Sequence, residues 1–329
     1  MWEGAQMSTT STTAVKEGVL GPLAKTTCKK PRSLWGDALR RLLRNKAAVI
    51  GLIFVILEIL LALAAPLVAP YHYAERSEGA TTQPPTRAHL LGTDGQGRDV
   101  LSRVIYGARI SLSVGFIAEI LILCIGIPLG LLAGYYGKWA DTLLMRFVDI
   151  MYAFPDLLLM IIIMTYLKAK LPTAEGGPLL LARRFWEWSG GTAGIFLALA
   201  ITSWLTLSRL VRGETLSLKR REFIEAAQCI GATHGQIMRR HLLPNVLAPI
   251  IISATLGVPA AILAEAGLSF IGIGVNPPTP SWGQMIFDGL SGLRSVPHMV
   301  IAPAAALALT VLSFNFLGDG LRDALDPRM

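Results

Sequence analysis

The chain has little charge for its length. Only 16% of its 329 residues are charged, whereas soluble domains average about 25%. Apolar residues make up 53% of the sequence. This balance favours a protein embedded in lipid over a soluble domain, so the chain is better described by membrane spans than by globular units.

Cysteine and histidine are sparse, and phosphate-binding loops are missing. Cys28, Cys124 and Cys229 have no metal-type spacing and are predicted to be unpaired thiols. The five histidines are scattered and form no ligand set. The segment Gly95–Gly97 lacks the Lys–Ser/Thr that ends a phosphate loop. We therefore expect no metal, no bound cofactor and no catalytic site in this chain.

The net charge of +8 raises the question of nucleic-acid binding. No nucleic-acid-binding module or row of aromatic residues accompanies the basic residues. These residues lie instead beside apolar runs, where they set membrane topology. We expect no nucleic-acid partner.

Six long apolar runs are present. A helix needs roughly 20 mainly apolar residues to cross a hydrocarbon core about 30 Å thick. The first run begins near residue 47, too late for an ordinary signal peptide. The third is shortened by Asp149, Pro155 and Asp156. The predicted spans are Ala47–Ala69, Ile110–Ala133, Val148–Leu167, Thr192–Leu210, Val246–Gly272 and Pro297–Leu317.

Both termini are predicted to be cytoplasmic. The segments before span one, between two and three, between four and five and after six hold about twice as many Lys and Arg as the other loops, and basic loops stay on the cytoplasmic side. Residues 1–33 are expected to be a disordered cytoplasmic leader. Residues 34–46, with Trp35 beside basic residues, are expected to form an amphipathic helix on the inner surface. Residues 47–329 then form the transmembrane domain.

Three glutamates, Glu58, Glu119 and Glu265, fall inside predicted spans. An acidic side chain at a helix centre costs about 2.5–3.5 kcal/mol on insertion scales, so none should face lipid. For Glu58 and Glu119 we favour protonation, pairing with another helix or a place near an interface. For Glu265 these roles and a place on a polar pathway stay equally open.

The fifth predicted span is the most prone to a kink or a break, because it contains Pro249, Gly257, Pro259 and Gly267. Interrupted helices are tolerated only where protein or a water-filled cavity meets the freed backbone groups. We therefore expect this span to line a pathway, with Glu265, Pro259 and Gly267 as candidate pathway residues.

The longest predicted cytoplasmic loop, about residues 211–245, has the pattern of two short helices and a turn. Residues Glu214–Cys229 contain good helix formers, Gly231 can take the positive φ that ends a helix, and Pro244 is expected to end the second helix. Such an element can pass movement from a soluble motor to the spans. The same pattern also fits an ordinary solvated hairpin.

A motif in this loop resembles the coupling-loop signature of bacterial ABC importer permeases in identity, spacing and position. His241 stands where the broad pattern often has Ile, a departure similar to the peptide-permease version. The resemblance implies that the Glu-Ala-Ala and Gly residues dock in the groove of a cytoplasmic ATPase. The motif residues are Glu225, Ala226, Ala227, Gly231, Leu243 and Pro244.

Other segments are similar to the OppC/DppC type, the second permease of peptide and nickel importers. These are Leu91–Arg103 before the second span, Glu265–Gly274 at the end of the fifth, and Asp319–Arg328. The resemblance extends from about Leu34 to Arg328. The first segment holds four charged residues for which pairing that braces the loop is favoured over substrate contact, while contact with a delivering binding protein stays open: Asp94, Arg98, Asp99 and Arg103.

The resemblance implies an all-α permease of type I ABC importer architecture in a bacterial or archaeal cytoplasmic membrane, carrying di- or oligopeptides. Its implied partners are a paralogous permease, one or two cytoplasmic ATPases that use ATP and Mg, an extracytoplasmic solute-binding protein, and membrane lipid. Nickel or oligosaccharide cargo remains an alternative within the family.

Two other functional classes are weighed. An ion-driven secondary transporter would show internal repeats and coupling acids at the midplane, and no clear repeat is present. A membrane assembly or receptor subunit would leave solute uptake independent of this chain. Neither the cargo nor the identity of the ATPases follows from the sequence.

Overall fold

The structure is a computed structural model that describes residues 34–173, 183–184, 186–187, 189–326. The expected leader, residues 1–33, lies outside this part. The regular elements of the chain in this part are helices joined by turns and loops, together with one isolated bridge between Thr93 and Asp99. The main helices are α1 (Leu34–Arg44), α2 (Lys46–Leu63), α3 (Ala65–Val68), α4 (Val100–Tyr136), α5 (Lys138–Tyr152), α6 (Asp156–Lys170), α8 (Thr192–Leu218), α9 (Glu222–Cys229), α10 (His234–Gln236), α11 (Leu243–Phe270), α12 (Trp282–Gly289) and α13 (His298–Leu325).

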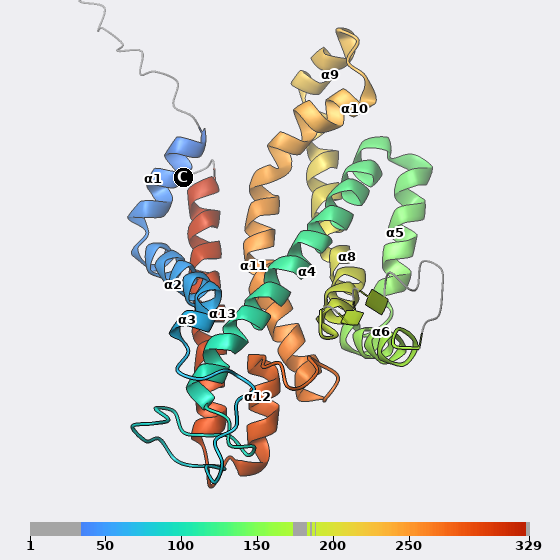
Figure 1. Ribbon diagram of the computed structural model, residues 1–329. Coiled ribbons are helices and arrows are strands. Elements are labelled where there is room, and N and C mark those ends of the chain that lie inside the picture. Colours follow the sequence, from blue (N-terminus) through green and yellow to red (C-terminus); the bar gives the residue numbers. More distant parts are fainter. Residues whose placement is uncertain (1–33, 174–182, 185, 188, 327–329) are drawn as a thin grey trace, which may run out of the picture.

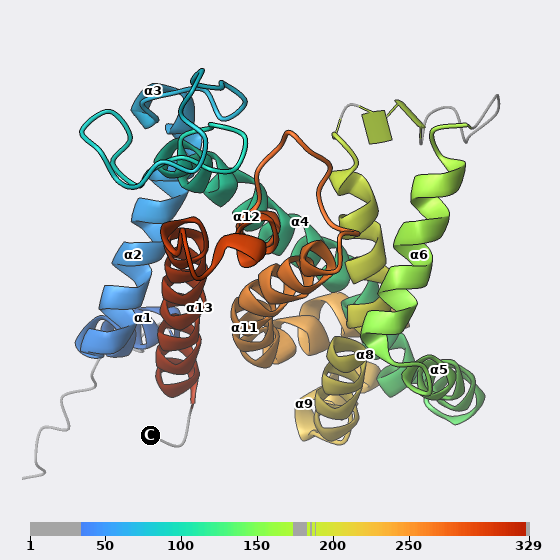
Figure 2. The ribbon, with the colours of Figure 1, turned by 90° about the horizontal axis from the view of Figure 1, so that it is seen from below.

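The helices form a bundle with two distinct ends. Figure 1 places α9 and α10 at one end, and α12 with the segment between α3 and α4 at the other. Seen from below, α2 and α13 lie side by side at one edge, α5 and α6 lie at the opposite edge, and α4, α8 and α11 lie between them (Figure 2). The helices α4, α8 and α11 therefore form the centre of the bundle and connect its two ends.

In the part of the chain that the structure describes, five helices are long and apolar enough to cross a membrane. They are α2, α4, α8, α13 and the continuous stretch His234–Phe270 that ends with α11. The pair α5 and α6 becomes a sixth span if its two helices, bent by 85° at the break, count as one.

The third predicted span, Val148–Leu167, is not one straight helix. It breaks between Tyr152 and Asp156, because Pro155 has no N–H to continue the ladder and disfavours helical backbone in the residue before it. The fifth predicted span, in contrast, is not broken, since α11 runs continuously past Pro249 and Pro259.

The second span begins earlier than predicted. Asp99 caps α4, its side chain accepting a hydrogen bond from the Ser102 N–H at 2.7 Å, so the helix starts at Val100 rather than Ile110. A short helix that was not predicted, α12, is capped in the same way by Ser281. Polar caps just outside apolar runs therefore set these two boundaries.

The central helices α4 and α8 pack closely through three glycines four residues apart, Gly126, Gly130 and Gly134. A Cβ built on Gly130 would lie only 2.6 Å from the backbone oxygen of Ser208. Small residues at this spacing let helix backbones approach each other in lipid. The sequence contained this signal, but the span prediction did not use it.

Candidate coupling loop, external brace and central cavity

The predicted coupling loop is a helix, a turn and a second helix. Gly231 ends α9 with φ +83°, a conformation that favours glycine. Thr233 then caps α10 through a capping box with Gln236. One detail differs from expectation: Glu214–Cys229 is not one helix, since α8 runs to Leu218 and α9 begins only at Glu222.

Helix α9 has one buried and one exposed face. Ile224 and Ala227 are buried at 0% and 3% exposure. Glu225 and Ala226 are exposed, and Ile230 just after the helix is 85% exposed. The motif residues therefore divide: Glu225 and Ala226 point outward, whereas Ala227 packs against the body. Ile230 was not among the residues predicted to contact the ATPase. Its exposure places its side chain on the same outer surface as Glu225 and Ala226.

The buried side of the loop is continuous with the bundle core. Ile224, Ile237 and Leu242 belong to the same apolar cluster as Trp204 and Val211 of α8. The loop is thus fixed to the central helices rather than hanging free.

Polar contacts add a second attachment. The Tyr135 hydroxyl at the end of α4 lies 2.7 Å from Nδ1 of His234 in α10. Lys219, just after α8, donates to the backbone oxygen of Tyr135. Asp141 of α5 pairs with Arg212 of α8. Sequence reasoning missed Tyr135, because its partners are about 100 residues away in the chain.

Pro244 does not end the second helix as predicted. The chain widens into a π-helical turn over Ile237–Leu242 and continues directly into α11, with Leu243 and Pro244 in its first turn. A proline inside a helix clashes with the carbonyl four residues earlier, and a wider turn accommodates the missing hydrogen bond. The predicted coupling loop is therefore joined to α11 without a break.

The segment between α3 and α4, which is predicted to be external, is braced by buried charges. Asp94 Oδ2 accepts from Arg98 Nε at 2.7 Å and lies 3.5 Å from Arg103 Nε. Asp99 turns the other way, towards His89 Nδ1 at 2.9 Å and the Ser102 hydroxyl at 2.7 Å. This geometry fits bracing of the loop against α4, the role that the sequence favoured.

Glu265 is fully buried and accepts hydrogen bonds from Ser269 at 2.6 Å and Ser281 at 2.8 Å. Since Ser281 caps α12, this carboxylate joins the end of α11 to α12. A cavity, called here the central cavity, lies between α4, α8 and α11, and none of the three predicted pathway residues, Glu265, Pro259 and Gly267, lines it. Their role in a pathway stays a prediction.

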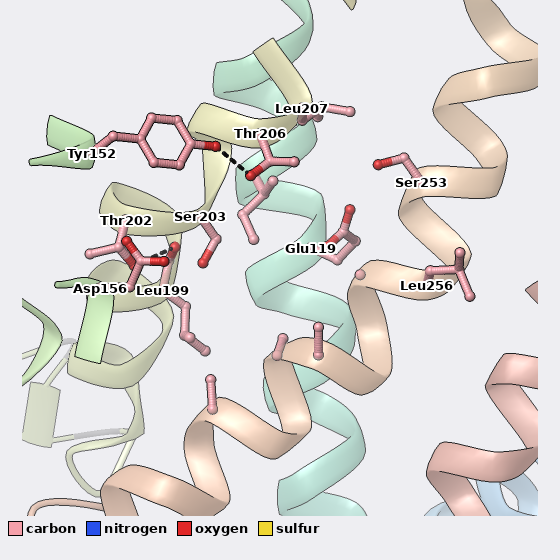
Figure 3. Close-up of a pocket in the computed structure, with 15 residues that line it drawn as sticks. Glu119, Tyr152, Asp156, Leu199, Thr202, Ser203, Thr206, Leu207, Ser253 and Leu256 are labelled. Atoms are coloured by element: carbon pink, nitrogen blue, oxygen red, sulfur yellow. Dashed lines mark hydrogen bonds between the residues drawn. The ribbon is translucent and has the colours of Figure 1, made fainter. Parts of the chain in front are cut away.

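Glu58 is paired in a similar way, accepting from the Thr310 hydroxyl of α13 at 2.6 Å. This contact joins α2 to α13, as expected for pairing between helices. Glu119 differs from both, because it lines a cavity of about 350 Å³ between α4, α8 and α11 (Figure 3).

Comparison with known proteins decides the family. The family described as the binding-protein-dependent transport system inner membrane component matches residues 126–329. The N-terminal TM domain of oligopeptide transport permease C matches residues 33–85. The dipeptide transport system permease protein DppC of Alkalihalophilus pseudofirmus is 44% identical over 297 residues, covering 90% of this chain and 91% of the relative.

The chain belongs to the ABC importer permeases of the dipeptide/oligopeptide type. Other relatives of this permease include the oligopeptide permease OppC of Bacillus subtilis, 40% identical over 92% of each chain. The glutathione transport system permease GsiD of Pectobacterium atrosepticum is 38% identical, covering 95% of this chain and 98% of the relative. The permease is therefore a multi-pass inner-membrane protein and a transport component of its importer.

The fold of the permease is also found in a solved transporter. A chain of the MetNI methionine ABC transporter, solved in inward-facing conformations, matches with a TM-score of 0.54 and 20% identity, covering 69% of this chain and 97% of that chain. At this identity the match supports the fold alone.

Proposed function

We propose that this permease forms half of a peptide pathway and is driven by separate ATPases that grip the outer face of α9. Its cargo is di- or oligopeptides delivered by an external binding protein, and its other half is a paralogous permease. The chain crosses the membrane six times, with α5 and α6 forming the bent span, and both termini face the cytoplasm.

The observation that carries the coupling role is the two-faced helix α9. An outer surface made by Glu225, Ala226 and Ile230 stands over an inner surface buried against α4 and α8. A partner that binds the outer surface moves the whole unit, because the inner surface and the Tyr135–His234 contact are packed into the central helices. The π-helical turn extends this unit into α11.

The orientation follows from the two ends of the bundle. The coupling loop with its basic residues occupies one end, and the braced segment of Asp94 and Asp99 the other (Figure 1). If ATPases bind the first end, the second faces the delivering protein. The basic α1, with Arg41 and Arg44 in its last turn, lies at the ATPase end, as basic cytoplasmic segments require.

Gentle purification of the tagged chain from its own membrane tests the proposal. We expect a second permease and one or two ATPases in stoichiometric amounts by mass analysis. Recovery of this chain alone, still active in solute uptake after reconstitution, would overturn the proposal in favour of a secondary transporter.

A matched pair of variants locates the ATPase contact. Ile230→Asp places a charge on the outer face of α9 and should lower ATPase recovery by about tenfold, the size of a contact worth somewhat over 1 kcal/mol. Glu78→Lys, an exposed change at the opposite end of the bundle, should leave recovery unchanged. If Ile230→Asp recovered as much ATPase as the unchanged chain, the outer face of α9 would not be part of the ATPase contact.

A further inference from the structure

The central cavity lies near the middle of three long helices. Glu119 comes from α4, Thr202 and Thr206 from α8, and Ser253 and Gly257 from α11 (Figure 3). Its volume of about 350 Å³ falls in the range of small-molecule sites, about 300–1,000 Å³. The cavity is therefore large enough for part of a peptide and lies midway between the coupling loop and the external segment.

Glu119 is only 6% exposed, and no hydrogen bond or ion pair to its side chain is found among the described residues. Glu58 and Glu265, by contrast, each accept at least one hydroxyl hydrogen bond. Among the described residues, the fully buried carboxyl oxygens without a partner are Oε2 of Glu58 and Oε2 of Glu265, whereas the oxygens of Glu119 are open to the cavity. The carboxylate of Glu119 is therefore placed to accept hydrogen bonds from a ligand in the cavity.

The neighbouring helix leaves room for this carboxylate. A Cβ on Gly257 would overlap the carboxylate of Glu119, so glycine is required there for α11 to pass so close. Figure 3 shows Glu119 between α4 and the Ser253 side of α11. The carboxylate is thus held at the cavity by the packing of two helices.

The rest of the wall carries hydroxyl groups and a second carboxylate but no positive charge. Asp156 supplies a second carboxylate, and no Lys, Arg or His is among the described lining residues. Arg209 stacks on the ring of Tyr152 at 4.1 Å, but its charge is paired with Asp149. The hydroxyls on the wall belong to Tyr152, Thr202, Ser203, Thr206 and Ser253.

This chemistry selects one kind of group. An ammonium carries three N–H donors and a positive charge, which carboxylates and hydroxyls satisfy. A carboxylate in the same place would meet two like charges and no cation. Of the two ends of a peptide, the charge of Glu119 and Asp156 favours the amino terminus and repels the carboxyl terminus.

We propose that this cavity holds the amino-terminal ammonium of a peptide in transit, with Glu119 as its counter-ion. The inference rests on the proposed peptide cargo and names the residue of this chain that contacts it. A site on a transport pathway must bind strongly enough for entry and weakly enough for release. We therefore expect the ammonium to bind here only transiently.

The first test measures the charge of the cavity without any peptide. The three cysteines of the chain are replaced by serine, and Ser253→Cys is then introduced. This variant is studied in the assembled complex. Its rate of modification is measured with a cationic and an anionic methanethiosulfonate reagent. Adding Glu119→Gln should lower the ratio of the cationic to the anionic rate about threefold or more, as expected for loss of a nearby unit charge in a wet cavity.

The control for this test is Glu58→Gln, which removes a carboxyl group buried between α2 and α13, outside the cavity. It should leave the rate ratio unchanged. A ratio that Glu119→Gln does not alter would overturn the proposal, since Glu119 would then present no charge to the cavity.

The second test separates transport from coupling. The complex is reconstituted in liposomes with its binding protein, and trialanine uptake and ATP hydrolysis are measured together. Glu119→Gln should keep ATPase stimulation by the loaded binding protein but lower uptake per ATP about tenfold, the loss expected for one charge-assisted hydrogen bond. Glu119→Asp, which keeps the charge, should restore part of the uptake.

The outcomes of the second test are distinct. Unchanged uptake per ATP in Glu119→Gln would overturn the ammonium site, and a parallel loss of uptake and ATPase stimulation would make Glu119 a packing residue and overturn it too. A parent complex that imports no peptide, whatever the cavity's charge, would instead overturn the proposed cargo.

Discussion

The hydroxyl of Tyr135 and Nδ1 of His234 lie 2.7 Å apart and join the end of α4 to the first residue of α10. The ring of Tyr135 is also within 5.4 Å of Lys219 Nζ. Since α4 carries Glu119 near its middle, one helix connects the coupling loop with the cavity wall. A movement of α10 therefore has a direct route to the proposed ammonium site.

Tyr135→Phe tests this connection, because it removes the hydroxyl and keeps the ring. Loss of one hydrogen bond costs about 1 kcal/mol, so we expect stimulation of the ATPase by the binding protein to fall about fivefold. Hydrolysis is measured with and without loaded binding protein. The matched control is Tyr136→Phe: Tyr136 is 49% exposed and touches His234 only through its ring, at 6.1 Å. An equal loss in both variants would contradict the prediction.

Gly231 is expected to be essential to the turn of the coupling loop. Gly231→Pro should abolish ATPase stimulation while the protein still inserts, because proline holds φ near −65° and lacks the N–H that Gly231 donates to Gln228. Gly231→Ala should be milder, at about 1–2 kcal/mol for the left-handed backbone. Gly235→Ala is the control, since Gly235 has no positive φ and its added Cβ would touch nothing. Unchanged stimulation in Gly231→Pro would remove this residue from the coupling mechanism.

The external brace should depend most on Asp94. Asp94→Asn leaves the guanidinium groups of Arg98 and Arg103 buried without their counter-charge, and we expect a loss of about 3–5 kcal/mol in stability. Thermal unfolding of the purified complex in detergent measures it, with the exposed Glu78→Gln as a control. Arg98→Ala should cost less, because Arg103 still faces Asp94. If Arg98→Ala left both fold and uptake intact, neither bracing nor an external contact would explain the residue.

Local features of the sequence predicted much of this architecture. Apolar length located the helices that are long enough to cross a membrane, and the Glu-Ala-Ala and Gly spacing predicted two helices and a turn, which does have the positive φ expected of Gly231. These signals are readable because each is contained in a short stretch of chain. The helix boundaries were less accurate, since single polar caps such as Asp99 fix them.

Features that depend on distant segments were not predictable in the same way. The helix breaks between α5 and α6 at Pro155, whereas α11 continues through Pro259. Which of these two outcomes a proline produces depends on the surrounding helices. The sequence favoured a structural role for Glu119 and left a pathway role equally open for Glu265. Only the three-dimensional arrangement shows that Glu265 meets two serine hydroxyls while Glu119 faces a cavity.

The close packing of α4 against α8 predicts a strong difference between two glycines. A Cβ on Gly130 would lie 2.6 Å from the Ser208 oxygen and 2.7 Å from Cβ of Val211, whereas one on Gly213 would touch nothing within 4 Å. Gly130→Ala should therefore cost about 1–3 kcal/mol of stability by overpacking, and Gly213→Ala almost none. Because α4 and α8 hold both the coupling loop and the cavity, Gly130→Ala should also lower ATPase stimulation and peptide uptake together. Thermal unfolding and uptake of the two variants, measured side by side, check this; equal stability would mean that the helices are not in close contact.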